Sequence, residues 1–134
     1  MPEPCSRPAP PLLRQALDEL NQGLWFQCHE TLEDLWKSHP KDAPERDLYK
    51  GILMLAVGLY HDGRGHRLGA LRKLPRAVEL LAPYTPVCQG VDVAELLACC
   101  ARLLGFLASA PLESPIPPPL LPRIALPGAS PNAH

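Results

Sequence analysis

Apolar residues recur at helical spacing through most of the chain. They repeat every three to four residues, which places them on one face of a helix and leaves polar residues on the other. The segments with this spacing are residues 12–22, 24–38, 44–62, 67–82 and 92–107. No segment alternates between apolar and polar residues for long enough to predict a strand. The pattern therefore predicts an all-α, up-and-down bundle of about five helices.

Residues that start or stop helices lie near the ends of these segments. Gly23 suits the end of the first helix, and Pro44 suits the first turn of the third. Asp92 and Glu95 have the spacing of a capping box at the start of the fifth helix. Pro75 lies inside the fourth helix, where it predicts a kink. The apolar residues expected to face the core from this fourth helix are Leu68, Leu71, Leu74, Val78 and Leu81.

Proline is concentrated at the two ends of the chain. Of the 18 prolines, five lie in residues 1–11 and eight lie in residues 111–134. Segments of this composition bury too little apolar surface to offset the entropy lost on ordering. We therefore expect a helical-bundle domain at residues 12–110, between a disordered N-terminal segment (residues 1–11) and a proline-rich disordered tail (residues 111–134).

Composition and charge narrow the class of protein. The 134 residues suffice for one domain with a single core. The net charge of -1 argues against a nucleic-acid-binding face, which needs an excess of Lys and Arg. The longest apolar segment, residues 52–60, is too short to cross a bilayer, and the N-terminal residues lack the apolar run of a signal peptide. We therefore expect a soluble, cytoplasmic protein that binds neither nucleic acid nor membrane.

The cysteines number five, and no two of them have the C-x-x-C spacing of a zinc site. In a reducing compartment, such cysteines serve as small buried apolar residues more often than as disulfides. We therefore expect all of them to be buried free thiols: Cys5, Cys28, Cys88, Cys99 and Cys100.

The stretch CHETLEDLW, residues 28–36, holds a polar pair that could carry chemistry. His29 and Glu33 are one helical turn apart, and rotations of about 100° per residue place both within the apolar face of their helix. Glu30, by contrast, falls on the solvated face. A carboxylate on an apolar face is costly unless it is paired, protonated or bound to a metal. The position of Glu33 therefore points to a site or to a buried polar pair.

A metal site needs a third ligand, and the next helix offers one. The short connection between the second and third helices predicts that they are antiparallel. One face of the third helix runs through Lys50, Met54, Val57 and His61. His61 could therefore reach the His29–Glu33 pair. Two imidazoles and one carboxylate would suit zinc, manganese, iron or nickel.

The aromatic residues near the pair allow two interpretations. Trp25 and Trp36 flank the pair on the second helix, while Tyr49 and Tyr60 lie on the third. Together they could form the walls of a ligand pocket. In the alternative, the tryptophans anchor the core, and the His–Glu pair hydrogen-bonds within itself or to a tyrosine and only fixes helix packing.

Several spaced segments resemble, in order, the bacterial and archaeal domain-of-unknown-function family 309. They are ALDELNQGLWFQCHETLEDLW, LYKGILMLAVGLYH, the G-x-x-x-GA of residues 65–70, and the PY-x-P and GVDV segments, all within about residues 12–97. The family's hallmark, H-x-x-x-E-x-x-W/Y, is met by His29, Glu33 and Trp36. The resemblance implies a small helical bundle with a suggested metal site and no established activity. Met54 stands where relatives often have glutamine, which implies a drier site here.

Three functions follow from these observations and stay open. The first is a binding module in which His29, Glu33 and His61 hold a divalent metal ion or a small ligand. The second is a metal-dependent hydrolase with Glu33 or a metal-bound water as the base. The third is a structural or interaction protein, such as a homo-oligomer formed through a bundle face. The sequence contains no nucleophile triad or cofactor-binding glycine loop, so it assigns no catalytic residue and leaves enzymatic activity open.

Overall fold

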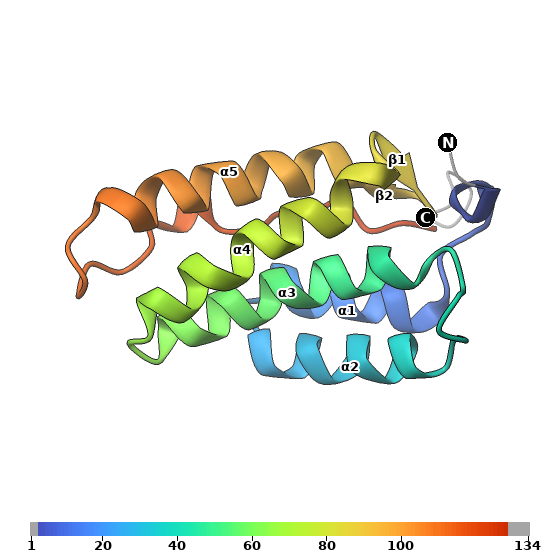
Figure 1. Cartoon of the computed structure of the whole chain (residues 1–134), viewed down its shortest axis with the longest axis horizontal. Coiled ribbons are helices and arrows are strands. Elements are labelled where there is room, and N and C mark those ends of the chain that lie inside the picture. The colour runs from blue at the N-terminus through green and yellow to red at the C-terminus, as the bar shows by residue number, and fades with distance from the viewer. Residues whose placement is uncertain (1–2, 129–134) are drawn as a thin grey trace.

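The helix boundaries lie close to those that the sequence predicts. The structure is a computed structural model that describes residues 3–128, and within these residues it contains five α-helices that run in alternating directions (Figure 1). They are α1 (Pro11–Asn21), α2 (Trp25–Lys37), α3 (Arg46–Gly63), α4 (Arg67–Leu81) and α5 (Val93–Ser109). The predicted all-α, up-and-down bundle is confirmed. In this part of the chain no helix combines the length and the apolar character needed to span a membrane.

The central helix of the bundle is α3. It packs against both α2 and α4, and half of its 18 residues are buried. Two glycines let α3 and α4 approach closely. A Cβ atom at Gly51 would lie 2.7 Å from Cγ of Leu81, and one at Gly58 would lie 3.3 Å from Cγ of Leu74. This close packing determines which side chains of α2, α3 and α4 share a surface.

Two of the predicted helix ends are found in the structure, whereas α3 begins two residues after Pro44, at Arg46. The carboxylate of Asp92 accepts a hydrogen bond of 2.9 Å from the backbone N–H of Glu95, so it caps the start of α5. Gly23 follows α1 and has a φ of 77°, a conformation that glycine adopts without steric cost. Pro75 is exposed and lies within α4, which continues past it to Leu81.

The inward face of α4 differs from the prediction at its first turn. Four of the five predicted apolar residues are buried or partly buried, but Leu68 is 60% exposed. Arg67 takes the inward position and is only 3% exposed. Its guanidinium can be buried because it donates hydrogen bonds to Asp62 and to backbone carbonyl oxygens of the tail. Apolar spacing alone could not reveal these acceptors.

A short hairpin between α4 and α5 corrects the prediction that the chain has no strand. β1 (Val87–Cys88) pairs antiparallel with β2 (Val91–Asp92), so that the first residue of one strand lies opposite the last residue of the other. The turn residues Gln89 and Gly90 have φ of 51° and 75°, as two-residue hairpin turns require. Strands of two residues are too short to show an alternating pattern in the sequence.

Two cysteines form a disulfide, which corrects the prediction that all five are free thiols. Cys5, in the 3₁₀ helix η1 (Glu3–Ser6), is bonded to Cys88 of β1 across 83 residues of sequence. The backbone N–H of Gln89 also donates to the carbonyl oxygen of Cys5 over 3.0 Å. The N-terminal segment, expected to be disordered, is therefore tied to the hairpin from residue 5. The remaining cysteines are buried free thiols, as predicted: Cys28, Cys99 and Cys100.

The proline-rich tail also lies against the bundle, at least over residues 111–128. It runs back toward the hairpin end of the molecule (Figure 1), and its Ile124 is buried. The amide group of Asn21 donates to the carbonyl oxygen of Ile124 and accepts from its N–H, both over 2.7 Å. Hydrogen bonds and packing of this kind offset the ordering entropy on which the prediction of disorder was based. Residues 1–2 and 129–134, also predicted to be disordered, lie outside the described residues.

Candidate functional site

The His29–Glu33 pair lies at the rim of the bundle. Nε2 of His29 is 3.6 Å from Oε2 of Glu33, and the two side chains are 29% and 40% exposed. The other carboxylate oxygen of Glu33 is 3.3 Å from Nζ of Lys37, one turn further along α2. The helical wheel therefore places both side chains on the correct side of α2, but it overestimates how deeply they are buried. Glu33 keeps contact with water and with a lysine, so its charge needs no metal ion to be tolerated.

A pocket of about 310 Å³ lies beside this pair, at the junction of α2, α3 and α4. We refer to it as the Lys50–Lys73 pocket. Its lining residues are His29, Glu33 and Trp36 of α2, Lys50, Leu53, Met54 and Val57 of α3, and Lys73 of α4. The antiparallel packing of α2 on α3, predicted from their short connection, brings these residues to one place.

Positive charge predominates on the wall of the Lys50–Lys73 pocket. Among residues 3–128, neither Lys50 nor Lys73 takes part in an ion pair. The ammonium group of Lys50 lies 5.7 Å from the ring centroid of Trp36, and the guanidinium of Arg46 lies 4.2 Å from it. Trp36 thus holds two cations of α3 near the pocket by cation–π attraction. The pocket combines an indole ring and an apolar floor with unpaired ammonium groups.

His61 does not complete a metal site with the pair. It lines a smaller pocket of about 190 Å³ with Phe26, His29, Val57 and Tyr60. Val57 and His29 line both pockets, and His61 is one turn beyond Val57, about 6 Å along the helix axis. Over the described part of the chain, no three His, Cys, Asp or Glu side chains form a group that could hold a metal ion. The donor set His29, Glu33 and His61 is therefore not assembled here.

The four aromatic residues predicted to wall one pocket are distributed over the molecule. Trp36 lines the Lys50–Lys73 pocket, and Tyr60 lines the smaller one. Trp25 instead lines a separate pocket next to the tail. Tyr49 is fully buried, and its hydroxyl donates a hydrogen bond of 2.8 Å to Oε1 of Gln89. Burial raises the pKa of Tyr49 to about 12, in keeping with a core residue.

Lys73 is the charged pocket residue that the sequence did not indicate. Lys50, Met54 and Val57 lie on the helix face that the sequence singles out, and all three line the pocket. Met54 is one of the apolar residues that line the pocket. Lys73 comes from α4, where its position relative to the apolar residues of the helix is that of an ordinary solvated lysine. Only the close contact between α3 and α4 reveals its position.

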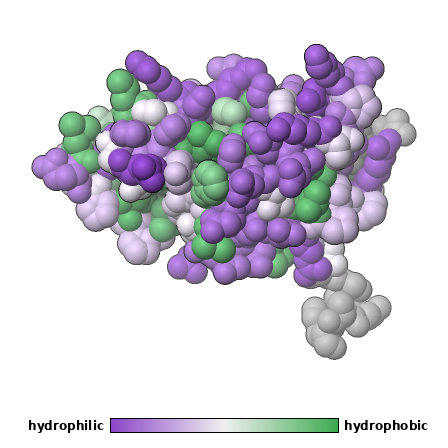
Figure 2. Space-filling view, turned by 90° about the horizontal axis from the view of Figure 1, so that it is seen from below, coloured by the Kyte–Doolittle hydropathy of each residue, from purple (hydrophilic) through white to green (hydrophobic). Residues whose placement is uncertain are grey.

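Exposed apolar side chains are scattered over the surface. On the face next to α2, Figure 2 shows small hydrophobic patches separated by hydrophilic residues. The two most exposed large apolar residues are Leu112 at 76% and Leu68 at 60%, and they lie on the tail and on α4. Single apolar residues of this kind are normal on soluble proteins. The face in Figure 2 therefore offers no broad apolar surface for a protein partner.

Comparison with known proteins shows that the pocket lies within the segment that matches a family model. Residues 13–73 match the model of the family described as Domain of unknown function (DUF309), and every residue lining the Lys50–Lys73 pocket lies in this segment. The uncharacterized protein YpuF of Bacillus subtilis (strain 168) is 39% identical over 57 residues, which cover 42% of this chain and 32% of YpuF. The chain thus spans about a third of that relative's length. The resemblance seen in the sequence is confirmed to the extent that residues 13–73 of this chain match the model of the family DUF309.

Proposed function

We propose that this protein is a binding module for a small organic anion held in the Lys50–Lys73 pocket. The proposal rests on the two ammonium groups of the pocket wall, which have no ion-pair partner among residues 3–128. The one carboxylate that lines the pocket, Glu33, already has Lys37 and His29 as partners. At an effective dielectric of about 20, one ammonium group attracts a carboxylate 4 Å away by about 4 kcal/mol before desolvation is subtracted. An anion would therefore be favoured over a neutral or cationic ligand.

The other walls of the pocket suit the carbon skeleton of such a ligand. Leu53, Met54 and Val57 form an apolar floor on α3, and the indole ring of Trp36 forms a side wall. A volume of about 310 Å³ is at the lower end of the range for small-molecule sites. It fits a compact molecule such as an aromatic or short-chain carboxylate. Burying the apolar part of such a ligand would contribute about 25 cal/mol for each Å² removed from water.

Binding of benzoate, compared with binding of its neutral analogue benzyl alcohol, tests the proposal. Isothermal titration should give a dissociation constant of about 1 mM for benzoate, as expected for a fragment-sized ligand, and much weaker binding of benzyl alcohol. Lys73→Gln should weaken benzoate binding about fivefold. The matched control is Arg72→Gln, because Arg72 is an exposed neighbour on α4 that does not line the pocket. Equal affinities for the two compounds, or equal effects of the two substitutions, would overturn the proposal.

His29→Ala separates this proposal from a purely structural role for the pair. Because His29 is partly exposed and its partner Glu33 also faces Lys37, its loss should change stability by less than about 1 kcal/mol. Benzoate binding should weaken, because the imidazole lines the pocket. A large drop in melting temperature with unchanged binding would instead support a structural pair. The metal interpretation of the pair stays a prediction, since a third protein ligand would have to move toward it.

A further inference from the structure

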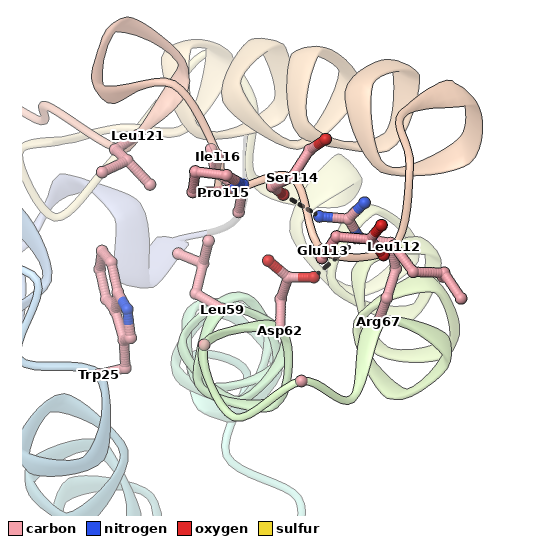
Figure 3. A pocket seen from close by; sticks show the side chains of 12 residues that line it. Trp25, Leu59, Asp62, Arg67, Leu112, Glu113, Ser114, Pro115, Ile116 and Leu121 are labelled. Carbon is pink, nitrogen blue, oxygen red and sulfur yellow. Dashed lines mark hydrogen bonds and ion pairs between the residues drawn. The ribbon is translucent and has the colours of Figure 1, made fainter.

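A third pocket, of about 390 Å³, lies where the tail crosses the bundle (Figure 3). We call it the tail pocket. One side is formed by the DUF309 segment, through Trp25 of α2, Leu59 and Asp62 of α3, and Arg67 of α4. The opposite side is formed by tail residues that lie outside that segment, among them Glu113 and Ile116.

The guanidinium of Arg67 holds the tail in place through hydrogen bonds. Its Nε–H donates to Oδ1 of Asp62 over 2.9 Å. Its two terminal nitrogens donate to the carbonyl oxygens of Ala110, Pro111 and Ser114. With its side chain only 3% exposed, the arginine has little capacity left to attract an anion. The single cation of this pocket therefore acts as a structural tie.

Hydrogen-bond acceptors remain on the pocket wall. Asp62 uses one carboxylate oxygen for Arg67, and Figure 3 shows the other turned toward the space between Trp25 and the tail. Glu113 lines the same space, and its carboxylate takes part in no ion pair among residues 3–128. The residues that line the pocket thus include two carboxylates and one guanidinium. The charge of its wall is opposite in sign to that of the Lys50–Lys73 pocket.

Apolar groups complete the wall. Trp25 stands on the side of the cavity opposite Arg67, with Leu59 between them, and Ile116 and Leu121 close the space from the tail (Figure 3). An indole ring attracts cations through its π face, and the attraction is stronger where water is partly excluded. Carboxylates, an indole and aliphatic side chains around one cavity are the groups that bind an ammonium ion with an apolar body.

We propose that the tail pocket is a second binding site, for a small organic cation of the aryl- or alkylammonium class. The ammonium group would lie near Asp62 and Glu113, where it finds acceptors of negative charge. The apolar body would lie against Trp25, Leu59 and Ile116. This site does not depend on the anion-binding function proposed above, because the two pockets have no lining residue in common.

The test uses phenethylammonium, with 3-phenylpropionate as its anionic counterpart. The chain has two tryptophans, so the indole N–H signals of Trp25 and Trp36 can be assigned with the variant Trp36→Phe. Phenethylammonium should shift the Trp25 signal with a dissociation constant of about 1 mM. Glu113→Gln should weaken this binding about fivefold. Trp25→Leu removes the reporting signal, so its binding is measured by isothermal titration, and it should be weakened about tenfold. Glu30→Gln, which removes an exposed carboxylate of α2 outside the pocket, should have no effect.

Several results would overturn the proposal. One is a Trp25 signal that 3-phenylpropionate shifts as strongly as phenethylammonium does, because charge then plays no part. Another is phenethylammonium binding that Glu113→Gln and Glu30→Gln reduce equally. A third is the absence of any shift up to about 10 mM. Both Glu113 and Glu30 are exposed, so neither substitution should disturb folding. A shift confined to Trp36 would also count against the tail pocket.

Discussion

Substitution of Arg67 by methionine should destabilise the protein and release its tail. The arginine and its partner Asp62 are 3% and 9% exposed, and Nε lies 2.9 Å from Oδ1. Methionine fills much of the same volume but leaves the Asp62 carboxylate without its charged partner. It also leaves the carbonyl oxygens of Pro111 and Ser114 without a donor. The tail should then detach from the start of α4.

The expected loss of unfolding free energy is about 3 kcal/mol. Removing one member of a buried ion pair typically costs about 3–5 kcal/mol, since the remaining charge is left in a poorly solvated place. The lower end applies here, because release of the tail would let water reach Asp62. Arg67→Lys should cost about half as much, since it keeps the charge but loses the planar fork that reaches several acceptors. A domain of this size has a total stability of about 5–15 kcal/mol, so the methionine variant should still fold.

Urea denaturation gives the free energies, and amide hydrogen exchange over residues 111–121 reports on the tail. The second substitution Asp62→Asn should recover about 1–2 kcal/mol in the Arg67→Met background, because it removes the unpaired charge. Exchange in the tail should become faster while exchange in α3 stays slow. A free energy within about 0.5 kcal/mol of the wild type, with an unchanged tail, would refute the argument that this arginine is a buried tie.

Further predictions concern packing, pH and metal ions. Gly51→Ala should lower the unfolding free energy by about 1 kcal/mol, because contact with Leu81 outweighs the better helix propensity of alanine. Gly105→Ala, whose new Cβ meets no atom within 4 Å, should raise the unfolding free energy by about 1 kcal/mol. If urea denaturation showed that both substitutions change this free energy in the same direction, the close packing of α3 on α4 would be contradicted. Burial raises the pKa of the Cys28 thiol from 9.0 to about 12, so the unfolded state loses this proton first. The contribution of Cys28 to stability should thus be fully present below about pH 9 and be lost between about pH 9 and pH 12. The urea midpoint should fall less steeply over this pH range in Cys28→Ala than in the wild type. Excess Zn²⁺ should leave the melting temperature unchanged, whereas a rise abolished by His29→Ala would establish a metal site.

The sequence predicts those features of the fold that depend on neighbouring residues. The helices follow from apolar spacing, and the cap of Asp92 on α5 follows from its position three residues before Glu95. Features that join distant residues were missed. Asn21 and Ile124 are 103 positions apart, and neither residue type indicates that an amide side chain will bind that stretch of backbone. The tail was therefore expected to be disordered on composition alone.

In the candidate site, too, the sequence predicts the local features and misses those that depend on distant residues. A helical wheel places His29 and Glu33 on one side of α2, and helix spacing places Lys50 and Met54 on one side of α3. The burial of these side chains and their neighbours depend on tertiary packing. This packing leaves the His29–Glu33 pair at the rim of the bundle and brings Lys73 of α4 into the same pocket. Tertiary packing also explains why Trp25 and Trp36 line different pockets. The tail forms a pocket beside Trp25, and the sequence does not predict it.

The bond between Cys5 and Cys88 makes a closed covalent ring of the residues between them. The ring contains α1 to α4, and with them all the residues that line the Lys50–Lys73 pocket. A protease that cuts once in the connection between α2 and α3 would divide the polypeptide but leave both pieces attached. Such a nicked molecule would migrate as one species until a reductant is added, and its two halves of the pocket would stay together.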